Sequence, residues 1–344
     1  MNKIVSFGEI LLRLKAPGFE RLFQSASLEA TFGGSEANVA ALLSEFGEKA
    51  SFVTIVPDNA VGEAVCADLR KYGVETKDIV RKNGRLGIYF LEAGACQRPS
   101  TVVYDRADSC ISNAEPEDFN WEKIFEGAEL FHVSGITPAL SEKARRVTIE
   151  GMKAAKKAGL SVSMDINYRS KLWNYGVNAS DVIKEMVNYV DYLISNEEHI
   201  RICLGITVPG YDVTKEGLPD DYFVSLCDKV SAVYPQLKAI TLTKRRTYSS
   251  DNNDFSAVLY DVEKKMFFVS TKYHIENIVD RVGAGDSFSG GLIYGFLNFD
   301  DKKQALEFAT ATACLKHTIP GDVAVLRKSE VEQLMKNGSG RIQR

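Results

Sequence analysis

The sequence predicts an α/β fold in which a mainly parallel sheet carries helices on both faces and a second, small β-sheet lies beside it. From about residue 128 onward, short apolar strands alternate with helix-length segments, which is the βαβ pattern of a parallel sheet. Residues 85–106 depart from this alternation, because they indicate two strands joined by a loop that contains Gly94 and Pro99. We expect the following division of the chain: an α/β core at 1–10, 33–84 and 108–336, a small β-sheet at 11–32 and 85–107, and a mobile tail at 337–344.

The composition is typical of a globular protein and excludes several classes of function. The chain has 344 residues, of which 45% are hydrophobic and 26% charged, and its net charge is −4. This balance favours neither nucleic acid nor a membrane surface as a partner, and no apolar run approaches the length of a membrane span. The 6 cysteines are scattered without a Cys-x-x-Cys pair. They indicate reduced core residues in a cytoplasmic protein rather than disulfides or metal ligands.

The elements of the first third follow from apolar periodicity and from glycine stops. Lys3–Phe7 is a first strand, because charges interrupt the apolar N-terminus in a way that a signal peptide would not allow. Val39, Leu42 and Phe46 lie on one face of a helix within 33–47 that ends at Gly47. The other elements expected here are a strand at 51–56, a helix at 60–72 and strands at 87–94 and 100–106.

The remaining elements alternate as a parallel sheet requires. We expect strands at 130–134, 161–166, 192–195 and 239–243, helices at 141–158, 180–189 and 220–234, a hairpin at 255–260 and 265–271, and helices at 302–318 and 329–336. Ligands of such sheets gather at the carboxyl ends of the strands. The polar residues that follow strands are therefore candidates for a site: Asp165, Asn167, Arg169, Asn196, Glu197, Thr243 and Lys244.

One stretch, IVDRVGAGDSFSGGLIYGFL at 278–297, has the features of a catalytic turn. It begins as an apolar strand, passes through a turn containing Gly283 and Gly285, and continues as a helix. A glycine-rich turn at a helix N-terminus directs free N–H groups and the positive end of the helix dipole toward one point, where an anion binds. Asp286 would be repelled by a resting phosphate and should face another reactant. A general base beside an anion site indicates phosphoryl transfer to a hydroxyl.

The same stretch excludes two better-known phosphate motifs. A P-loop needs Lys after its last glycine, and Gly291 stands at that position. A dinucleotide fingerprint needs a third glycine where this chain has Phe288. Taken alone, the stretch leaves two readings of Asp286 open, namely a general base and a simple helix cap.

Two motifs in this order resemble the ribokinase-like (PfkB) carbohydrate kinases. DRVGAGDSFSGGLIYGF at 280–296 resembles their C-terminal signature, and GGSEANVAAL at 33–42 resembles the GG-x3-N-x-A-x2-L element. The resemblance implies a three-layer α/β/α core with a β-sheet lid over the sugar. It also implies roles for individual residues: Asp286 as catalytic base, Gly283, Ala284 and Gly285 as the anion hole, and Gly33, Gly34 and Asn38 as sugar contacts.

Further elements of the resemblance concern the substrate. DINYRSKLW at 165–173 resembles the family's D-x-N-x-R-x3-W element, which implies substrate contacts for Asn167 and Arg169. The lid strands carry Tyr89, Tyr104 and Arg106, and Tyr104, Arg106 and Ser109 resemble the Y-x-R-x-x-S element of 2-keto-3-deoxygluconate kinases. Guanidinium groups pair well with a carboxylate, so two arginines fit an acid sugar better than a neutral one.

The nucleotide side of the resemblance differs from the family pattern at two places. SNEEHI at 195–200 has Asn196 of the N-x-x-E element, but His199 stands at the Glu position, so Glu197 or Glu198 would organise magnesium through water. In ITLTKRRTYSS at 240–250, cations replace the usual glycines. The nucleotide contacts that the resemblance implies are Asn196, Thr243, Lys244, Gly283 and Gly285. It further implies ATP and Mg²⁺, allows a monovalent cation, and suggests by analogy a homo-oligomer formed through the lid.

The sequence therefore predicts an ATP-dependent kinase that phosphorylates the terminal hydroxyl of 2-dehydro-3-deoxygluconate. One alternative is a kinase for fructose or another neutral ketose, which would not require Arg106. A second alternative is a non-catalytic sugar-binding protein on the same scaffold. The intact GAGD sequence ending at Asp286 argues against this second alternative, because a pure binding protein needs no base.

Overall fold

The computed structural model describes residues 3–211 and 217–337, and within them nine strands form one central sheet. The order across this sheet is β14-β13-β12-β11-β10-β9-β1-β4, with β15 paired to β13. The strands from β12 to β4 are parallel, whereas β13 runs antiparallel to β12, β14 and β15. Their bounds are β1 Lys3–Phe7, β4 Lys49–Val53, β9 Ala128–Ser134, β10 Ser161–Asp165, β11 Tyr192–Ser195, β12 Ala239–Thr247, β13 Asn253–Asp261, β14 Met266–Val269 and β15 Tyr273–Ile275.

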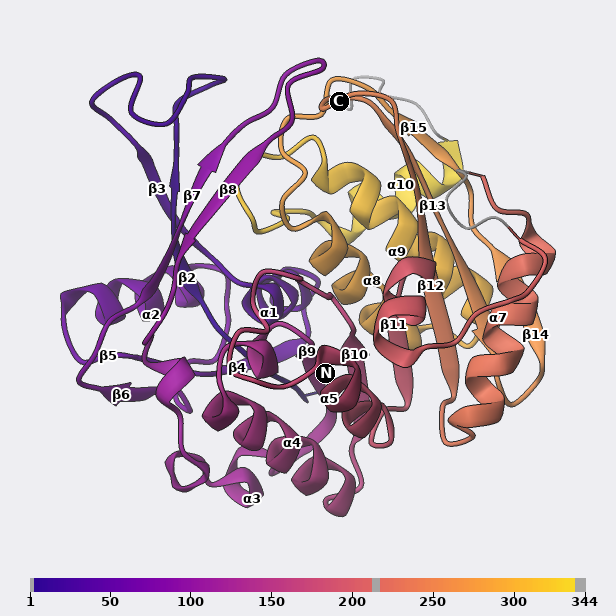
Figure 1. Cartoon of the computed structure of the whole chain (residues 1–344), viewed down its shortest axis with the longest axis horizontal. Helices are drawn as coiled ribbons and strands as arrows, with labels where there is room; N and C mark the ends of the chain where they lie inside the picture. Colours follow the sequence, from indigo (N-terminus) through magenta and orange to yellow (C-terminus); the bar gives the residue numbers. More distant parts are fainter. Residues whose placement is uncertain (1–2, 212–216, 338–344) are drawn as a thin grey trace.

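Helices cover both faces of the central sheet (Figure 1), as the sequence predicts. Side chains alternate along a strand, so Val5 packs with the helices of one face and Ile4 with those of the other. One face carries α1 Ser35–Glu45, α2 Ala60–Lys71, α8 Ala284–Asn298, α9 Lys302–Lys316 and α10 Lys328–Asn337. The opposite face carries α3 Trp121–Ile124, α4 Glu142–Lys157, α5 Ala179–Val187 and α7 Asp220–Val233. The predicted α/β fold class is confirmed.

A second sheet of four strands, here called the lid sheet, stands away from the core (Figure 1). Its order is β3-β2-β7-β8, with bounds β2 Leu11–Lys15, β3 Glu29–Gly33, β7 Gly87–Glu92 and β8 Thr101–Asp105. Strands β2, β7 and β8 lie within the segments 11–32 and 85–107 expected to form a small β-sheet, and β3 extends one residue beyond the first segment, to Gly33. A short parallel pair, β5 Ile55–Pro57 and β6 Val80–Lys82, connects the core to the second of these segments.

Three details differ from the prediction. Residues 278–282, expected to be a strand, form an irregular segment, because Val279 N–H donates to the His317 carbonyl at the end of α9 and the Asp280 carboxylate accepts from Val282 N–H. Strand β12 extends to Thr247 rather than stopping at 243, since β13 pairs with its whole length. The strand expected at 51–56 is two strands that separate at Thr54. The predicted tail at 337–344 lies, except for residue 337, outside the described residues.

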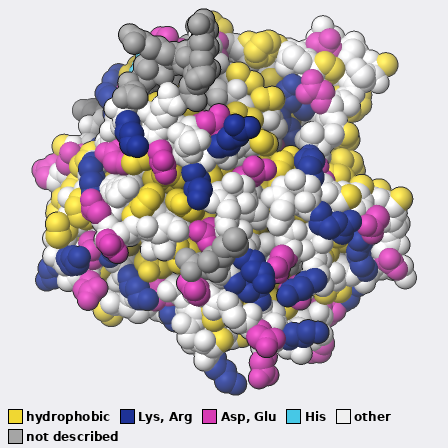
Figure 2. All heavy atoms as spheres, turned by 180° about the vertical axis from the view of Figure 1, so that it is seen from behind, with side chains coloured by type: hydrophobic (Ala, Val, Ile, Leu, Met, Phe, Trp, Pro, Cys, Tyr) yellow, Lys and Arg dark blue, Asp and Glu magenta, His cyan; other side chains and the backbone are white. Residues whose placement is uncertain are grey.

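The surface agrees with the small net charge of the sequence. Figure 2 shows Lys and Arg side chains interspersed with Asp and Glu across the described part of the face that it presents. Among residues 3–211 and 217–337, no helix combines the length and the apolar character needed to cross a membrane.

Candidate active site

A cavity of about 570 Å³ lies where the lid sheet meets the carboxyl ends of the central strands. Asp165 and Ser195 line it from the ends of β10 and β11, and Leu11 lines it from the lid sheet. Most of the predicted site residues line this one cavity: Gly33, Gly34, Asn38, Tyr89, Tyr104, Arg106, Asn167, Arg169, Asn196, Glu197, Glu198, Thr243, Gly283, Gly285 and Asp286. Ala284 and Lys244 are predicted residues that do not line it.

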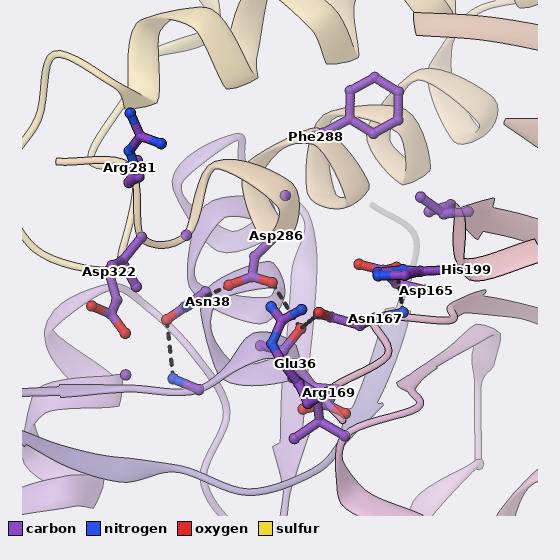
Figure 3. A pocket seen from close by; sticks show the side chains of 18 of the residues that line it. Glu36, Asn38, Asp165, Asn167, Arg169, His199, Arg281, Asp286, Phe288 and Asp322 are labelled. Carbon is purple, nitrogen blue, oxygen red and sulfur yellow. Dashed lines mark hydrogen bonds between the residues drawn. The ribbon is translucent and has the colours of Figure 1, made fainter. Parts of the chain in front are cut away.

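Asp286 lies in the first turn of α8 and is held by two side chains from the start of α1 (Figure 3). Ser35 Oγ donates to Asp286 Oδ1 at 2.7 Å, and Asn38 Nδ2 donates to Asp286 Oδ2 at 2.7 Å. The N-cap position of α8 is Gly283, with no side-chain cap. Asp286 therefore does not act as a helix cap, and of the two readings left open by the sequence, the geometry favours a base.

A chain of hydrogen bonds fixes the groups that hold Asp286. Asn38 Oδ1 accepts from Gly34 N–H at 3.3 Å, which leaves the amide nitrogen of Asn38 for Asp286. Asn167 Nδ2 donates to Ser35 Oγ at 3.2 Å, so that hydroxyl can donate its own proton to Asp286. Burial raises the pKa of Asp286, and the two donors partly oppose that shift. A carboxylate with a raised pKa is a stronger proton acceptor than an exposed aspartate.

The N-terminus of α8 supplies backbone N–H groups beside Asp286. Gly283 has φ +82°, and a Cβ there would lie 2.0 Å from the Asp322 carbonyl oxygen, so both conformation and space require glycine. A Cβ on Gly285 would meet no atom within 4 Å, because this residue lines the open cavity. Among the described residues, the N–H groups of Gly283 and Gly285 have no acceptor, whereas Ala284 N–H donates to the Arg281 carbonyl at 3.3 Å. The predicted anion hole thus has its free donors on the two glycines.

A buried ionic cluster ties the lid sheet to the anion-hole turn. Arg13 of β2 pairs with both Asp280 and Asp322, and the Tyr89 hydroxyl donates to Asp322 Oδ1 and Oδ2 at 2.7 Å. Lys316, which is fully buried at the end of α9, donates to the carbonyls of Asp280 at 3.2 Å and Ile319 at 2.9 Å. Nearly balanced charge makes such burial tolerable. Because Asp280 immediately precedes the turn, this cluster holds the turn in place.

The lid side of the cavity contains the residues that resemble the acid-sugar element. Arg106 is buried, and its Nε donates to Glu9 Oε2 at 2.7 Å while its Nη2 pairs with the same oxygen. Ser109 Oγ donates to Glu9 Oε1 at 2.7 Å. The Arg106 guanidinium also lies 5.1 Å from the centre of the Tyr104 ring. Glu9, which is not among the predicted site residues, thus positions Arg106 and already balances its charge.

Three further guanidinium groups line the cavity, on Arg169, Arg245 and Arg281. Arg169 and Lys244 are the predicted site residues here, whereas Arg245 stands only among the cations that replace the family's usual glycines. Lys244 instead points away from the cavity, where its ammonium pairs with Asp220 at 2.9 Å and lies 4.6 Å from the Phe223 ring centre. The alternation of β12 explains this, since Thr243 and Arg245 share one side of the strand. Because the predicted strand ends at Thr243, the sequence did not indicate which of the following side chains face the cavity.

The segment expected to organise magnesium forms a short helix, α6 Glu197–His199, capped by Asn196 Oδ1, which accepts from His199 N–H at 2.7 Å. Burial, assisted by Arg169, lowers the pKa of His199 to about 4, so its ring is neutral. Glu197 and Glu198 both line the cavity. Within the described ranges, no three His, Cys, Asp or Glu side chains form a ready metal site. These carboxylates could therefore act on a metal only together with other ligands.

Glu36 is a buried carboxyl group behind Asp286, and its titration gives a testable stability effect. Ser134 N–H and Oγ donate to Glu36 Oε1 at 3.0 and 2.7 Å, yet burial raises the pKa of Glu36 from 4.5 to about 7. The folded chain therefore binds this proton more tightly than the unfolded chain does. Stability from this group is present below about pH 4.5 and is lost as the pH rises through about 7.

We expect Glu36→Gln, which keeps an acceptor for Ser134, to gain stability relative to the original protein as the pH rises from about 4.5 to about 7. Thermal unfolding of both proteins across this range measures the difference in Tm. A difference that stays constant with pH would show that Glu36 does not carry the buried proton.

Comparisons with known proteins match nearly the whole chain to carbohydrate kinases. A family model described as pfkB family carbohydrate kinase matches residues 1–328. A 2-dehydro-3-deoxygalactonokinase of Haloferax volcanii is 33% identical over 342 residues, covering 99% of this chain and 99% of its own. A fructokinase of Solanum lycopersicum, fructokinase-2, is 27% identical over 358 residues, covering 98% and 97%. The crystal structure of 2-dehydro-3-deoxygluconokinase from Thermotoga maritima is 46% identical with a TM-score of 0.91, covering 98% of this chain and 100% of that chain.

Proposed function

The chain belongs to the pfkB family of carbohydrate kinases, and we propose that it transfers the γ-phosphoryl group of ATP to the terminal hydroxyl of 2-dehydro-3-deoxygluconate. The observation that carries this proposal is the position of Asp286, which lies beside the free N–H groups of the anion hole in a cavity that Arg106 also lines. A base, an anion site and a cation for the substrate are the three groups that this reaction needs in one place.

Each group of the chain has a distinct task in this reaction. ATP supplies the phosphoryl group. Asp286, held by Ser35 and Asn38, accepts the proton of the attacking hydroxyl. The N–H groups of Gly283 and Gly285 and the N-terminus of α8 stabilise negative charge on the transferred group. The lid sheet, which is fixed to the anion-hole turn through Arg13, covers the sugar and limits access of water.

The residues that line the cavity also fit the expected magnesium ion. Magnesium keeps several waters and binds through one or two carboxylates together with substrate phosphates, which suits Glu197 and Glu198 in the cavity wall. When bound, it would neutralise charge on the phosphates.

A monovalent cation and a homo-oligomer formed through the lid stay predictions. We place the reaction in the cytoplasm, since six cysteines carry free thiols.

The choice of an acid sugar rests on the arginines. Arg106 directly follows lid strand β8 and lies beside Tyr104, and Arg169 lines the same cavity, where its charge acts on the carboxylates of Asp165 and Asp286 without a direct ion pair in the described part of the chain. The relative that is 46% identical is named for 2-dehydro-3-deoxygluconate, and the one that is 33% identical for the galactonate, which is likewise a 2-dehydro-3-deoxy sugar acid. A second candidate, phosphorylation of a neutral ketose, is favoured by one observation. Glu9 already neutralises Arg106, so the lid side carries little net charge.

Substitution of Arg106 decides between these candidates. We expect Arg106→Met to lower kcat/KM for 2-dehydro-3-deoxygluconate by roughly ten- to a hundredfold, the range for a lost charge-assisted hydrogen bond. Fructose, which lacks the carboxylate, should be a poor substrate and lose little further. A coupled ADP-release assay with the gluconate, the galactonate and fructose measures this.

The variant also removes the partner of buried Glu9, so a second protein, Glu9→Gln/Arg106→Met, serves as the control. If the double variant regains activity toward the acid sugar, Arg106 mainly compensates Glu9. Equal losses for acid and neutral substrates would mean that Arg106 supports the lid rather than the carboxylate. A preference of the unmodified protein for fructose would establish the second candidate instead.

A further inference from the structure

A buried ammonium group lies between the two segments that flank the anion-hole turn. Lys316, the last residue of α9, is fully buried, and its Nζ donates to the Asp280 carbonyl at 3.2 Å and to the Ile319 carbonyl at 2.9 Å. Among the described residues, no carboxylate oxygen lies within ion-pair distance of this nitrogen. Backbone carbonyl oxygens therefore bind the ammonium, and they are also the ligands with which a protein replaces the water of a monovalent cation.

The two carbonyls belong to segments that must keep a fixed position for the anion hole to form. Asp280 immediately precedes the turn, and Ile319 lies in the segment that follows α9. Gly321 N–H of this second segment donates to Asp280 Oδ2 at 3.1 Å, so the segments are already joined on the carboxylate side. Lys316 joins them on the carbonyl side. Loss of its ammonium would leave two buried carbonyls without a donor and would loosen the turn.

The charge of Lys316 completes the ionic cluster behind the site. Arg13 supplies one positive charge against the two carboxylates of Asp280 and Asp322, so the charges balance when Lys316 is protonated. Burial lowers the pKa of Lys316, and these two carboxylates oppose that shift. The carboxylate of Asp286 acts on Lys316 in the same direction. The ammonium in turn favours the ionised form of the base.

We propose that Lys316 is a positioning residue whose ammonium serves as a built-in monovalent cation for the anion-hole turn. The proposal rests on the proposed kinase function and replaces the dissolved monovalent cation that the family resemblance allows. Lys316 does not line the cavity, so it acts through the turn and not on the substrate. The original protein should therefore be equally active in potassium chloride and in tetramethylammonium chloride at the same ionic strength.

Two substitutions separate the charge of the side chain from the space that it fills. Lys316→Ala removes the ammonium and leaves room for an ion, whereas Lys316→Met removes the ammonium and fills the room. In tetramethylammonium chloride both should lower kcat roughly ten- to a hundredfold, the range for lost hydrogen bonds to a charged group. Potassium or ammonium chloride should restore most of the activity of Lys316→Ala only. ADP is quantified by chromatography, since a coupling enzyme could itself respond to the cation.

Thermal unfolding tests the same site without turnover. Potassium should raise the Tm of Lys316→Ala more than that of the original protein or of Lys316→Met, because an ion that binds only the folded chain stabilises it. The matched control is Lys3→Ala. Lys3 is also buried, and its Nζ donates to the carbonyls of Ile124 at 2.8 Å and Glu126 at 2.7 Å, away from the cavity. This variant should lose stability and keep its kcat.

Several results would overturn the proposal. One is an original protein that loses activity when tetramethylammonium replaces potassium. Another is a Lys316→Ala protein in which neither cation raises kcat or Tm, and a third is an equal loss of kcat in Lys3→Ala. If Lys316→Ala folds only with added potassium, the proposal is supported, and if it stays unfolded in potassium, the proposal is wrong. Because the Tm measurement involves no substrate, an error in the assigned reaction or sugar leaves it readable.

Discussion

Asp286→Asn is expected to lower kcat by a factor of about 10² to 10⁴ or more while leaving nucleotide affinity almost unchanged. The substitution keeps the size of the side chain and removes its ability to accept a proton. Asn38 Nδ2 can still donate to the remaining carbonyl oxygen, and the Ser35 hydroxyl can rotate to accept from the new amide. The fold around the site should therefore persist. Steady-state kinetics with a measured Kd for ATP separates the loss of rate from a loss of binding.

The pH dependence of kcat gives an independent check on Asp286. Burial raises its pKa, and only the deprotonated carboxylate can act as a base. Activity of the original protein should fall as the pH falls through that raised pKa, and Asp286→Asn should lack this acidic limb. Ser35→Ala, which removes one of the donors that lower the pKa, should shift the limb to higher pH. Near-normal turnover in Asp286→Asn would rule out the assignment.

The parts of the candidate site whose geometry could be predicted from sequence are those that depend on local spacing. Gly283, Gly285 and Asp286 lie within four positions of one another, so their arrangement at a helix N-terminus follows from the turn itself. The same holds for Gly34 and Asn38 at the start of α1. In both places a glycine-rich turn precedes a helix with a clear apolar face, which makes helix position and register predictable.

The residues missed are those whose partners are distant in sequence or whose strand was longer than expected. Arg13 meets Asp322 across 309 positions, and Glu9 meets the predicted residue Arg106 across 97, so no local sequence pattern indicates Arg13 or Glu9. For Arg245 the reason is different. It stands among the cations that replace the family's usual glycines, but the strand was expected to end at Thr243, whereas pairing with β13 extends it to Thr247 and fixes which side chain faces the cavity. Tertiary pairing thus overrides local propensity there.

Gly285→Val is expected to abolish ATP turnover in a protein that still folds. A Cβ at this position meets nothing within 4 Å, and Gly285 lines the cavity, so the branched side chain would enter the space where the anion binds. Loss of access to preorganised N–H donors lowers kcat by about 10² to 10³ per donor, and here the anion itself would be displaced. The Tm should stay close to that of the original protein, because no packed atom is disturbed.

Gly283→Val is the contrasting variant, since it lies in the same turn and has the opposite structural setting. Its φ of +82° is strained for any side chain, at about 1–3 kcal/mol, and its Cβ would lie 2.0 Å from the Asp322 carbonyl oxygen. This variant should lose stability first, and activity as a consequence. Thermal unfolding and the ADP-release assay are measured for both variants. Loss of Tm in Gly283→Val reports a distorted turn, whereas loss of turnover at an unchanged Tm in Gly285→Val reports blocked access of the anion to the turn. Normal turnover in a stable Gly285→Val protein would contradict the anion hole, because a phosphoryl group approaching those N–H groups has to pass within contact of that side chain.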